Sequence, residues 1–291
     1  MEVEVYDRAA AKVFFEKQYK EQQADFLYNT FMGRILLKLF IASKTFSKLN
    51  AISGSGKKSV KKIKPFIEQY NIDMTDFGDT AYKSFNDFFI RKTLPGKRPF
   101  SVLKEDLIAV ADSKLTVFDI NDALEMKIKG NRYTVDELLK DTGVSQAFAG
   151  GTCLLYRLTV DDCHRYCFFD NGRQTGSKTI NGRLHTVGPV SAKRYKVYKE
   201  NFRVASFLET ENFGSCVYME VGALLIGKIH NYDITDYKKG DEKGFFLPGA
   251  STIVLLFKKD TVRIDDDIRA YSKKGIETKI KMGEKIGVCH A

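Results

Sequence analysis

With 291 residues, the chain is long enough for about two domains, or for one large domain with an additional segment. Its composition, 43% hydrophobic and 29% charged residues, allows a sizeable buried core and excludes a wholly disordered chain. The net charge is +10, and nine basic residues lie within 26–64, a stretch that contains no Asp or Glu. The remainder of the chain is therefore nearly neutral.

Membrane-spanning and secreted proteins do not fit this sequence. The longest apolar run, Ile35 to Ala42, contains Lys38 and falls short of the roughly 18 residues that a spanning helix needs. The first residues, Met1 to Val5, lack the charged-then-apolar layout of a signal peptide. The five cysteines are odd in number and irregularly spaced, so we expect reduced thiols in a cytosolic compartment.

The amino-terminal part is predicted to be helical. We expect a helix over 8–50, because the apolar residues within 26–49 recur every three or four positions. The Gly- and Ser-containing stretch 51–56 would end it and begin a flexible, lysine-rich link, and a shorter helix would cover 58–70.

A short helix precedes a change to strands. Ser84 and Asp87 have the spacing of a capping box, which predicts a short helix toward Arg91 that the Pro-Gly pair at 95–96 would stop. Thr134 and Glu137 predict a second capped helix over 135–140. The remaining predicted elements are β-prone runs at 109–111, 115–118, 126–128, 153–158, 215–229 and 252–257.

Two of these runs have informative patterns. Val217, Met219 and Val221 alternate with polar or amphipathic residues, which predicts a half-buried strand. The run 252–257 is apolar without alternation, as in a strand buried on both faces. The sequence therefore predicts an α+β protein, with a helical, basic region over 1–95 and a β-rich domain over 96–291.

The basic segment admits three interpretations. A basic amphipathic helix with Phe and Leu on one face is typical of a peptide that lies on an anionic membrane surface. The same lysines would fit nucleic acid, or a helix that packs on the β-rich domain and leaves its charges in solvent. The stretch 54–59 is not a phosphate-binding loop, because Ala51 stands where such a loop needs Gly.

Several residues could carry chemistry. Ser251 follows Gly249 and Ala250 at a tight corner before the buried strand, but it lacks the Gly-x-Ser-x-Gly form of a hydrolase elbow. Asp112 ends a β-like stretch, where a turn residue is the ordinary interpretation. His185 and His230 lie beside apolar residues and are expected to be hydrogen-bonded structural histidines.

The densest polar cluster is the segment 161–167. It contains Asp161, Asp162, Cys163, His164 and Cys167, and its ordinary interpretation is a polar loop with a capping Asp. A metal site made from the two thiols and the imidazole would lack a fourth ligand, so we expect no metal here.

Taken together and in order, these segments resemble the phosphatidylserine decarboxylases, the self-processing, pyruvoyl-dependent enzymes that make phosphatidylethanolamine. The resemblance covers nearly the whole chain. Its segments are 84–91, 94–99, 128–130, 148–151, 157–165, 184–187, 209–214, 221–223, 239–244 and 249–252.

The resemblance implies a self-cleavage between Ala250 and Ser251. The Ser251 hydroxyl would attack the Ala250 carbonyl, and the ester would eliminate to give a β chain 1–250 and an α chain 251–291. The first residue of the α chain would become a pyruvoyl group, which decarboxylates phosphatidylserine through a Schiff base with the substrate amine. Ser251 would thus be both the processing nucleophile and the precursor of the cofactor.

The family assigns self-cleavage to an Asp-His-Ser relay, which Asp112 and Ser251 match. Of the two histidines that the family usually carries three residues apart, His164 is present and Cys167 replaces the second. Either His164 serves both processing and reprotonation, or Cys167 contributes as a thiolate, or processing is slow. Ala250 replaces the usual Gly and adds a methyl group at the scissile bond.

The predicted function is decarboxylation of phosphatidylserine to phosphatidylethanolamine and CO2 by a peripheral enzyme on the cytoplasmic face of the cell membrane. Its partners would be phosphatidylserine in an anionic membrane surface and the β and α chains of the processed enzyme, without nucleic acid. The alternatives are an unprocessed member that binds lipid, and a soluble amino-acid decarboxylase on the same scaffold. The sequence leaves a monomer and a homodimer open.

Overall fold

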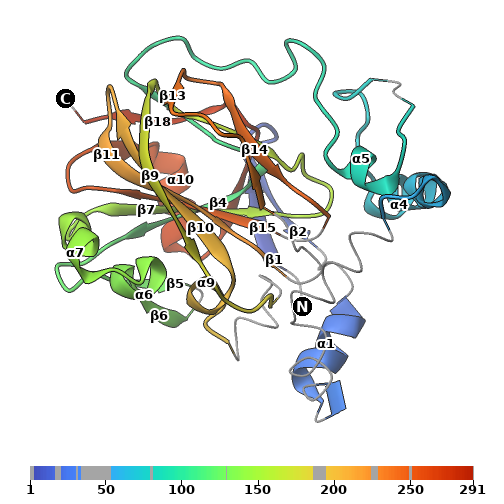
Figure 1. Cartoon of the computed structure of the whole chain (residues 1–291), viewed down its shortest axis with the longest axis horizontal. Helices are drawn as coiled ribbons and strands as arrows, with labels where there is room; N and C mark the ends of the chain where they lie inside the picture. Colours follow the sequence, from blue (N-terminus) through green and yellow to red (C-terminus); the bar gives the residue numbers. More distant parts are fainter. Residues whose placement is uncertain are drawn as a thin grey trace.

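The computed structural model describes residues 3–16, 21–30, 32–33, 54–78, 81–128, 130–185, 195–223, 229–248 and 251–290. A ten-stranded sheet forms its centre, with the strand order β13-β9-β10-β11-β15-β7-β4-β17-β1-β2 (Figure 1). Its strands are β1 (Val3–Asp7), β2 (Lys12–Glu16), β4 (Ser113–Asp119), β7 (Thr152–Leu158), β9 (Gly172–Ile180), β10 (Arg203–Thr210), β11 (Gly214–Val221), β13 (Asp236–Tyr237), β15 (Ser251–Phe257) and β17 (Glu277–Ile280).

Smaller sheets and helices complete the described part of the chain. The other strands are β3 (Asp106–Ile108), β5 (Glu125–Ile128), β6 (Asn131–Thr134), β8 (Arg165–Cys167), β12 (Ile229–Asn231), β14 (Glu242–Phe246), β16 (Val262–Ile264) and β18 (Lys285–Cys289). The helices are α1 (Glu21–Asn29), η2 (Lys57–Lys62), α4 (Ile63–Tyr70), α5 (Phe85–Phe89), α6 (Val135–Leu139), α7 (Thr142–Ser145), η3 (Gln146–Phe148), α9 (Val197–Glu200) and α10 (Asp266–Lys273). None of the described helices is long and apolar enough to cross a membrane.

The large sheet separates two hydrophobic cores. On the face that we call the front, Ile253, Leu255 and Phe257 of β15 pack with residues of the sheets β12-β14-β8 and β16-β18-β3 and with Ile268 of α10. On the rear face, Val254 and Leu256 pack with residues of β5, β6, α6, η3 and α9. Because side chains alternate along a strand, Ser251 belongs to the front face and Thr252 to the rear face.

Burial on both faces confirms the prediction for 252–257, since every residue of β15 is buried. The prediction for 217–221 was wrong in one respect. Tyr218 and Glu220, the residues that alternate with the apolar ones, are fully buried as well. Their front face is covered by the small sheet β12-β14-β8, where Lys243 neutralises Glu220 with an Nζ–Oε1 distance of 2.6 Å.

The predicted helix over 8–50 was wrong at its start. Lys12–Glu16 is the strand β2, which pairs antiparallel with β1 after a turn at Ala11, where φ is 49°. β1 in turn pairs parallel with β17, so this hairpin extends the central sheet. The apolar spacing that predicted a helix lies within 26–49, of which only 26–30 and 32–33 are described. The apolar spacing within 26–49 therefore gave no information about the structure of residues 12–16.

Downstream, the predicted helices are confirmed. The stretch 58–70 forms η2 and α4, and Ser84 caps α5 by accepting a hydrogen bond from the Asp87 N–H. Thr134 and Glu137 form the capping box of α6. The predicted run 109–111 lies just after β3, in a turn toward β4.

The described residues within 54–92 form a compact unit with a small apolar core of its own around Ile63, Ile72 and Phe88. Gly54, expected to be part of a flexible link, is buried there, and its carbonyl accepts hydrogen bonds from the Asn86 N–H and the Ser59 hydroxyl. In Figure 1 this unit, with α4 and α5, lies beside one end of the central sheet.

Candidate active site

One end of the sheet collects the residues singled out in the sequence. Ser251, the first residue of β15, lies opposite Leu158, the last residue of β7. Lys114 lies opposite Arg157, so Ser113 at the start of β4 is level with Leu158. Asp112 precedes Ser113, and the segment with His164 follows Leu158. Since neighbouring strands are about 4.8 Å apart, the β4 and β15 ends are about 10 Å apart.

Ser251 is fully buried, and within the described residues its Oγ has no hydrogen-bond partner. Residues 249 and 250, which include the predicted cleavage position Ala250, lie outside the described residues. The β15 ladder fixes the Ser251 backbone between β7 and β11. A hydroxyl that is held in place but has no partner can react without breaking an existing hydrogen bond.

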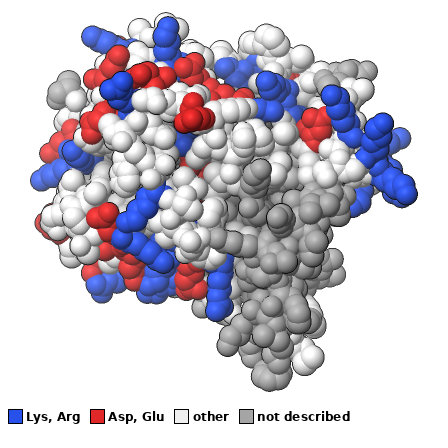
Figure 2. Space-filling model, viewed as in Figure 1, with Lys and Arg blue, Asp and Glu red and all other residues white. Residues whose placement is uncertain are grey.

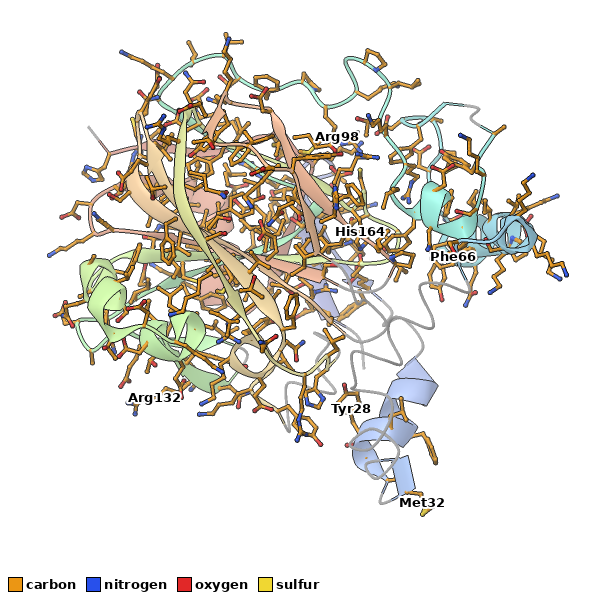
Figure 3. All side chains as sticks on the ribbon, in the orientation of Figure 1. Tyr28, Met32, Phe66, Arg98, Arg132 and His164 are labelled. Carbon is orange, nitrogen blue, oxygen red and sulfur yellow. The ribbon has the colours of Figure 1, made fainter. Side chains whose placement is uncertain are left out.

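His164 lies where the end of the sheet meets α5 (Figure 3). It is fully buried, and its ring packs on Phe89 of α5 with a centroid distance of 4.2 Å. Its Nδ1 is 3.0 Å from the carbonyl oxygen of Asp162. The His164 carbonyl accepts the Phe246 N–H at 2.9 Å, which ties this residue to the segment that leads toward Ser251.

The Asp112 carboxylate is held by a neighbour that sequence reasoning did not single out. Arg98 donates from Nε and Nη2 to its two oxygens at 2.8 and 2.7 Å, and the Met282 N–H donates at 2.8 Å. Arg98 also donates to Asp76 at 2.7 Å and so links the 54–92 unit to this end of the sheet. Asp112 is thus a buried, charge-paired carboxylate.

Cys167 lies on β8, fully enclosed on the front face, and its N–H donates to the Val110 carbonyl at 2.9 Å. Burial raises the pKa of its thiol to about 12. Burial likewise raises the pKa of Cys163 to about 11, with a contribution from the Asp112 charge. Both cysteines are therefore neutral thiols near pH 7, and a thiolate is unfavourable at either position.

Behind Ser251, the rear face carries a cluster of buried charges that we call the rear ion network, made up of Glu16, Lys114, Arg157, Asp162 and Glu277. Lys114 lies within 3.1 Å of Glu16 and 2.9 Å of Asp162. Arg157 donates to Glu277 at 2.8 Å and to Glu16 at 2.7 Å. Burial lowers the pKa of Lys114, but the nearby carboxylates outweigh this effect and keep it charged.

Asp162 connects the rear ion network to His164. Burial raises its pKa to about 6, against the opposing effect of Lys114, so its carboxyl group is ionised at neutral pH. Its carboxylate also accepts the Thr159 N–H at 2.7 Å. The capping Asp expected in this loop is therefore present, and its side chain is 9% exposed.

His185 was expected to be a hydrogen-bonded structural histidine, and its side chain differs from this expectation. Within the described residues its two ring nitrogens have no hydrogen-bond partner, and the ring stacks on Tyr195 with a centroid distance of 4.1 Å. Its backbone is held by Asn201, whose side chain also donates to the Gly222 carbonyl at 2.8 Å. Burial lowers the pKa of His185 to about 4, so the ring is neutral.

Comparison with known proteins decides the family. A family model described as phosphatidylserine decarboxylase matches residues 85–288, a range that includes Asp112, His164, Cys167 and Ser251. The chain belongs to the phosphatidylserine decarboxylase family. Within the described residues, no three His, Cys, Asp or Glu side chains form a group that could hold a metal ion.

Similar curated proteins cover almost the full chain. A protein named phosphatidylserine decarboxylase proenzyme 2 from Clostridium acetobutylicum is 58% identical over 287 residues, 99% of both chains. Phosphatidylserine decarboxylase proenzymes from Ruminiclostridium cellulolyticum and Clostridium perfringens are each 38% identical, over 98–99% of both chains. Membership of the decarboxylase family thus extends to the amino-terminal region that precedes residue 85.

Sequence reasoning missed the residues that hold the site together. Arg98 and Arg157 were part of matching segments but had no expected partner, and Lys114 and Glu277 were not singled out. Their contacts join residues that are 14 to 141 positions apart in the chain. The only local signal was the alternation of Ser113, Lys114 and Leu115, which would place the lysine on the opposite face from its neighbours.

Proposed function

We propose that this chain is a proenzyme that cleaves itself between Ala250 and Ser251 and then decarboxylates phosphatidylserine to phosphatidylethanolamine and CO2. The observation that carries the proposal is the Ser251 hydroxyl, buried and without a hydrogen-bond partner in the described residues, at the end of the sheet where the segments of His164 and Asp112 also lie. The names of the similar proteins support the substrate and the proenzyme character.

A pyruvoyl group derived from Ser251 fits this position. β15 is buried along its whole length and paired on both sides, so the first residue of an α chain 251–291 would stay fixed after cleavage. Because the Ser251 Oγ has no hydrogen-bond partner in the described residues, conversion of Ser251 to a pyruvoyl group would break no hydrogen bond there. When present, a pyruvoyl ketone supplies the electron sink that decarboxylation of an amino acid requires.

Among the alternatives for the processing base, His164 is favoured over Cys167. A neutral imidazole has a nitrogen lone pair that can accept a proton, whereas burial keeps the Cys167 thiol protonated until about pH 12. His164 would take the Ser251 hydroxyl proton as Oγ attacks the Ala250 carbonyl carbon, and return it to the departing amine nitrogen. Asp112 would contribute through its charge near the site rather than as a mobile base, because Arg98 holds both of its oxygens.

The membrane-associating part of the proposal rests on the helical unit beside the site. Five lysines of η2 and α4 are exposed, and Figure 2 shows a group of basic side chains at this edge of the molecule. These lysines are Lys57, Lys58, Lys61, Lys62 and Lys64. Each can contribute about 1 kcal/mol of attraction to an anionic leaflet, which would bring the site to a lipid substrate on the cytoplasmic face.

Intact-mass measurement of the purified protein tests the proenzyme hypothesis. We expect chains of 250 and 41 residues, because cleavage after residue 250 of 291 leaves 41, and a ketone on the shorter chain that a hydrazide reagent labels. Vesicles that contain phosphatidylserine should be converted to phosphatidylethanolamine with release of CO2. A single uncut chain without a ketone would favour the unprocessed lipid-binding alternative, and release of CO2 from free serine alone would favour a soluble amino-acid decarboxylase.

Flotation with vesicles tests the membrane part separately. Binding to vesicles with 30–40% anionic lipid should weaken as salt rises, because exposed charges are screened within about 10 Å at 0.1 M. Changing the five lysines of η2 and α4 to Gln should remove most of this binding. The matched control changes five exposed lysines elsewhere, Lys12, Lys104, Lys127, Lys259 and Lys273, to Gln. Equal losses in both variants would contradict a dedicated docking surface.

A further inference from the structure

The segment that carries His164 is a tight turn closed by Asp162. The Asp162 N–H donates to the Thr159 carbonyl at 3.0 Å. In return, the Asp162 carboxylate accepts the Thr159 N–H at 2.7 Å and the Thr159 hydroxyl at 2.9 Å. This reciprocal pattern fixes the backbone of the turn two residues before the catalytic imidazole.

Lys114 locks the Asp162 carboxylate from the rear face of the sheet. Its Nζ donates to both carboxylate oxygens, at 3.1 and 2.9 Å, and also to the Thr159 hydroxyl. The Lys114 side chain is 1% exposed, so its charge is stable only while carboxylates surround it. Turning Asp162 away would leave a buried ammonium short of a partner, and the turn is therefore rigid.

Arg91 holds the same turn from the side of α5. Its Nη2 donates to the Asp161 carbonyl at 2.7 Å, while its guanidinium lies over the rings of Phe77 and Phe88. The Arg91 carbonyl accepts the Cys163 thiol at 3.6 Å. Two buried cations, Lys114 from the sheet and Arg91 from the helical unit, thus both bind the turn.

The tautomer of His164 follows from this arrangement. Its Nδ1 is 3.0 Å from the Asp162 carbonyl oxygen, and because a carbonyl only accepts, Nδ1 carries the proton. In a neutral imidazole the lone pair then lies on Nε2. The Asp112 carboxylate, which the relay would place on Nδ1, is occupied by Arg98 and the Met282 N–H.

We infer that Asp162, rather than Asp112, is the residue that orients His164, and that Lys114 acts with it as a second positioning residue. The inference rests on the proposed self-cleavage, in which His164 is the base. The Asp162 carbonyl holds Nδ1–H, the carboxylate–Lys114 pair keeps that carbonyl in place, and Nε2 takes the Ser251 proton. The same proton passes to the Ser251 nitrogen as its bond to the Ala250 carbonyl carbon breaks, which turns the amide into an ester without another reactant. Loss of the Ser251 α-proton would then release the Ala250 carboxylate, and water would convert the resulting enamine into the ketone with release of ammonia.

Imidazole nitrogen NMR on the uncut chain tests this directly. The sample is a Ser251→Ala protein in which all four histidines are labelled with ¹⁵N. The pair of ring-nitrogen signals that disappears when His164 is also changed to Ala belongs to His164. We expect a protonated, pyrrole-type Nδ1 and an unprotonated, pyridine-type Nε2 at neutral pH. The opposite tautomer would overturn the inference, whatever the chain's activity and without any substitution at Asp162.

Cleavage kinetics supply the second readout. Asp162→Asn keeps the shape of the side chain but removes its charge from Lys114, and we expect self-cleavage to slow by about 10²-fold because the base is misplaced. NMR of the corresponding uncut variant should show both His164 tautomers. The matched control is Asp170→Asn, because Asp170 is also buried and hydrogen-bonded but its partner is Asn212.

These outcomes separate the inference from the proposed function. An unchanged tautomer together with an unchanged cleavage rate in Asp162→Asn would overturn the positioning role. An equal slowing in Asp170→Asn would also contradict it, because the effect would then be general to buried carboxylates. A wild-type chain that never cleaves would contradict the proposed function, and the tautomer of His164 would still decide this inference.

Discussion

The two faces of the sheet at the Ser251 end are built in opposite ways. On the rear face, Lys114 and Arg157 are fully enclosed and each is bound by at least two carboxylates. On the front face, the Ser251 hydroxyl has no hydrogen-bond partner in the described residues. The charged contacts are therefore concentrated behind the strand, and the hydroxyl that we propose as the nucleophile lies in front of it.

This difference depends on the register of a single strand. Ser251 and Thr252 are adjacent, both fully buried, and neither hydroxyl has a partner in the described residues. A shift of one residue would move the serine to the charged rear face and the threonine to the front face. The seven continuous pairs between β15 and β7 hold the register that keeps them apart.

The largest expected effect comes from removing one hydroxyl or the other. Ser251→Ala should abolish self-cleavage and activity, because the remaining Thr252 hydroxyl points to the rear. Thr252→Ala should cleave at a rate within a few-fold of wild type, measured by intact mass over time. A Ser251→Ala chain that still cleaves would show that the difference between the faces is not what selects the nucleophile.

On the front face, the two candidate bases should separate clearly. His164→Ala should slow cleavage by about 10²–10⁴-fold, the usual contribution of a positioned base. Cys167→Ala should change the rate less than tenfold, because burial keeps this thiol neutral up to about pH 12. Quenched time courses on electrophoresis gels measure both rates. Equal losses would instead indicate that the thiol belongs to the proton-transfer path.

Breaking the rear ion network should reduce stability. Arg157→Met leaves Glu277 and Glu16 without this cation, and an uncompensated buried charge costs about 3–5 kcal/mol. Urea unfolding in the Ser251→Ala background, where the chain stays in one piece, gives the free energy of unfolding. Arg173→Ala is the control, since its pair with Asp236 is exposed and contributes little to the free energy of unfolding. A similar decrease in the free energy of unfolding in both variants would mean that burial does not determine how much an ion pair contributes to stability.

The sequence predicted the parts of this comparison that are local. The unbroken apolar run of β15 and the capping patterns at Ser84 and Thr134 depend on neighbouring residues, and all three are confirmed. The segment with His164 was identified because its chemistry is dense within seven positions. The site residues themselves came from matching segments in order, and their roles remain predictions.

The parts that depend on distant contacts could not be predicted. Arg157 binds Glu16 and Glu277, residues 141 and 120 positions away, and no pattern near any of them indicates the pairing. The hairpin of β1 and β2 was missed for the same reason, because its strands are stabilised by a parallel pairing with β17 near the other end of the chain. Long-range pairing outweighed the helix expected from the residues that follow.

The smallest expected effect concerns a neutral histidine at the same end of the sheet. Burial lowers the pKa of His185 to about 4, whereas an unfolded histidine titrates near 6.5. As the pH falls from about 6.5 to about 4, the unfolded chain takes up a proton that the folded chain does not, so the free energy of unfolding decreases across this window. His185→Phe keeps a ring against Tyr195 and should reduce this loss of stability, measured by urea unfolding at pH 7 and pH 5.

The control is His290→Phe, at an exposed position near the carboxyl terminus, which should retain the full loss of stability. If both variants respond to acid like the wild type, the neutral His185 ring does not contribute to the acid sensitivity of the fold.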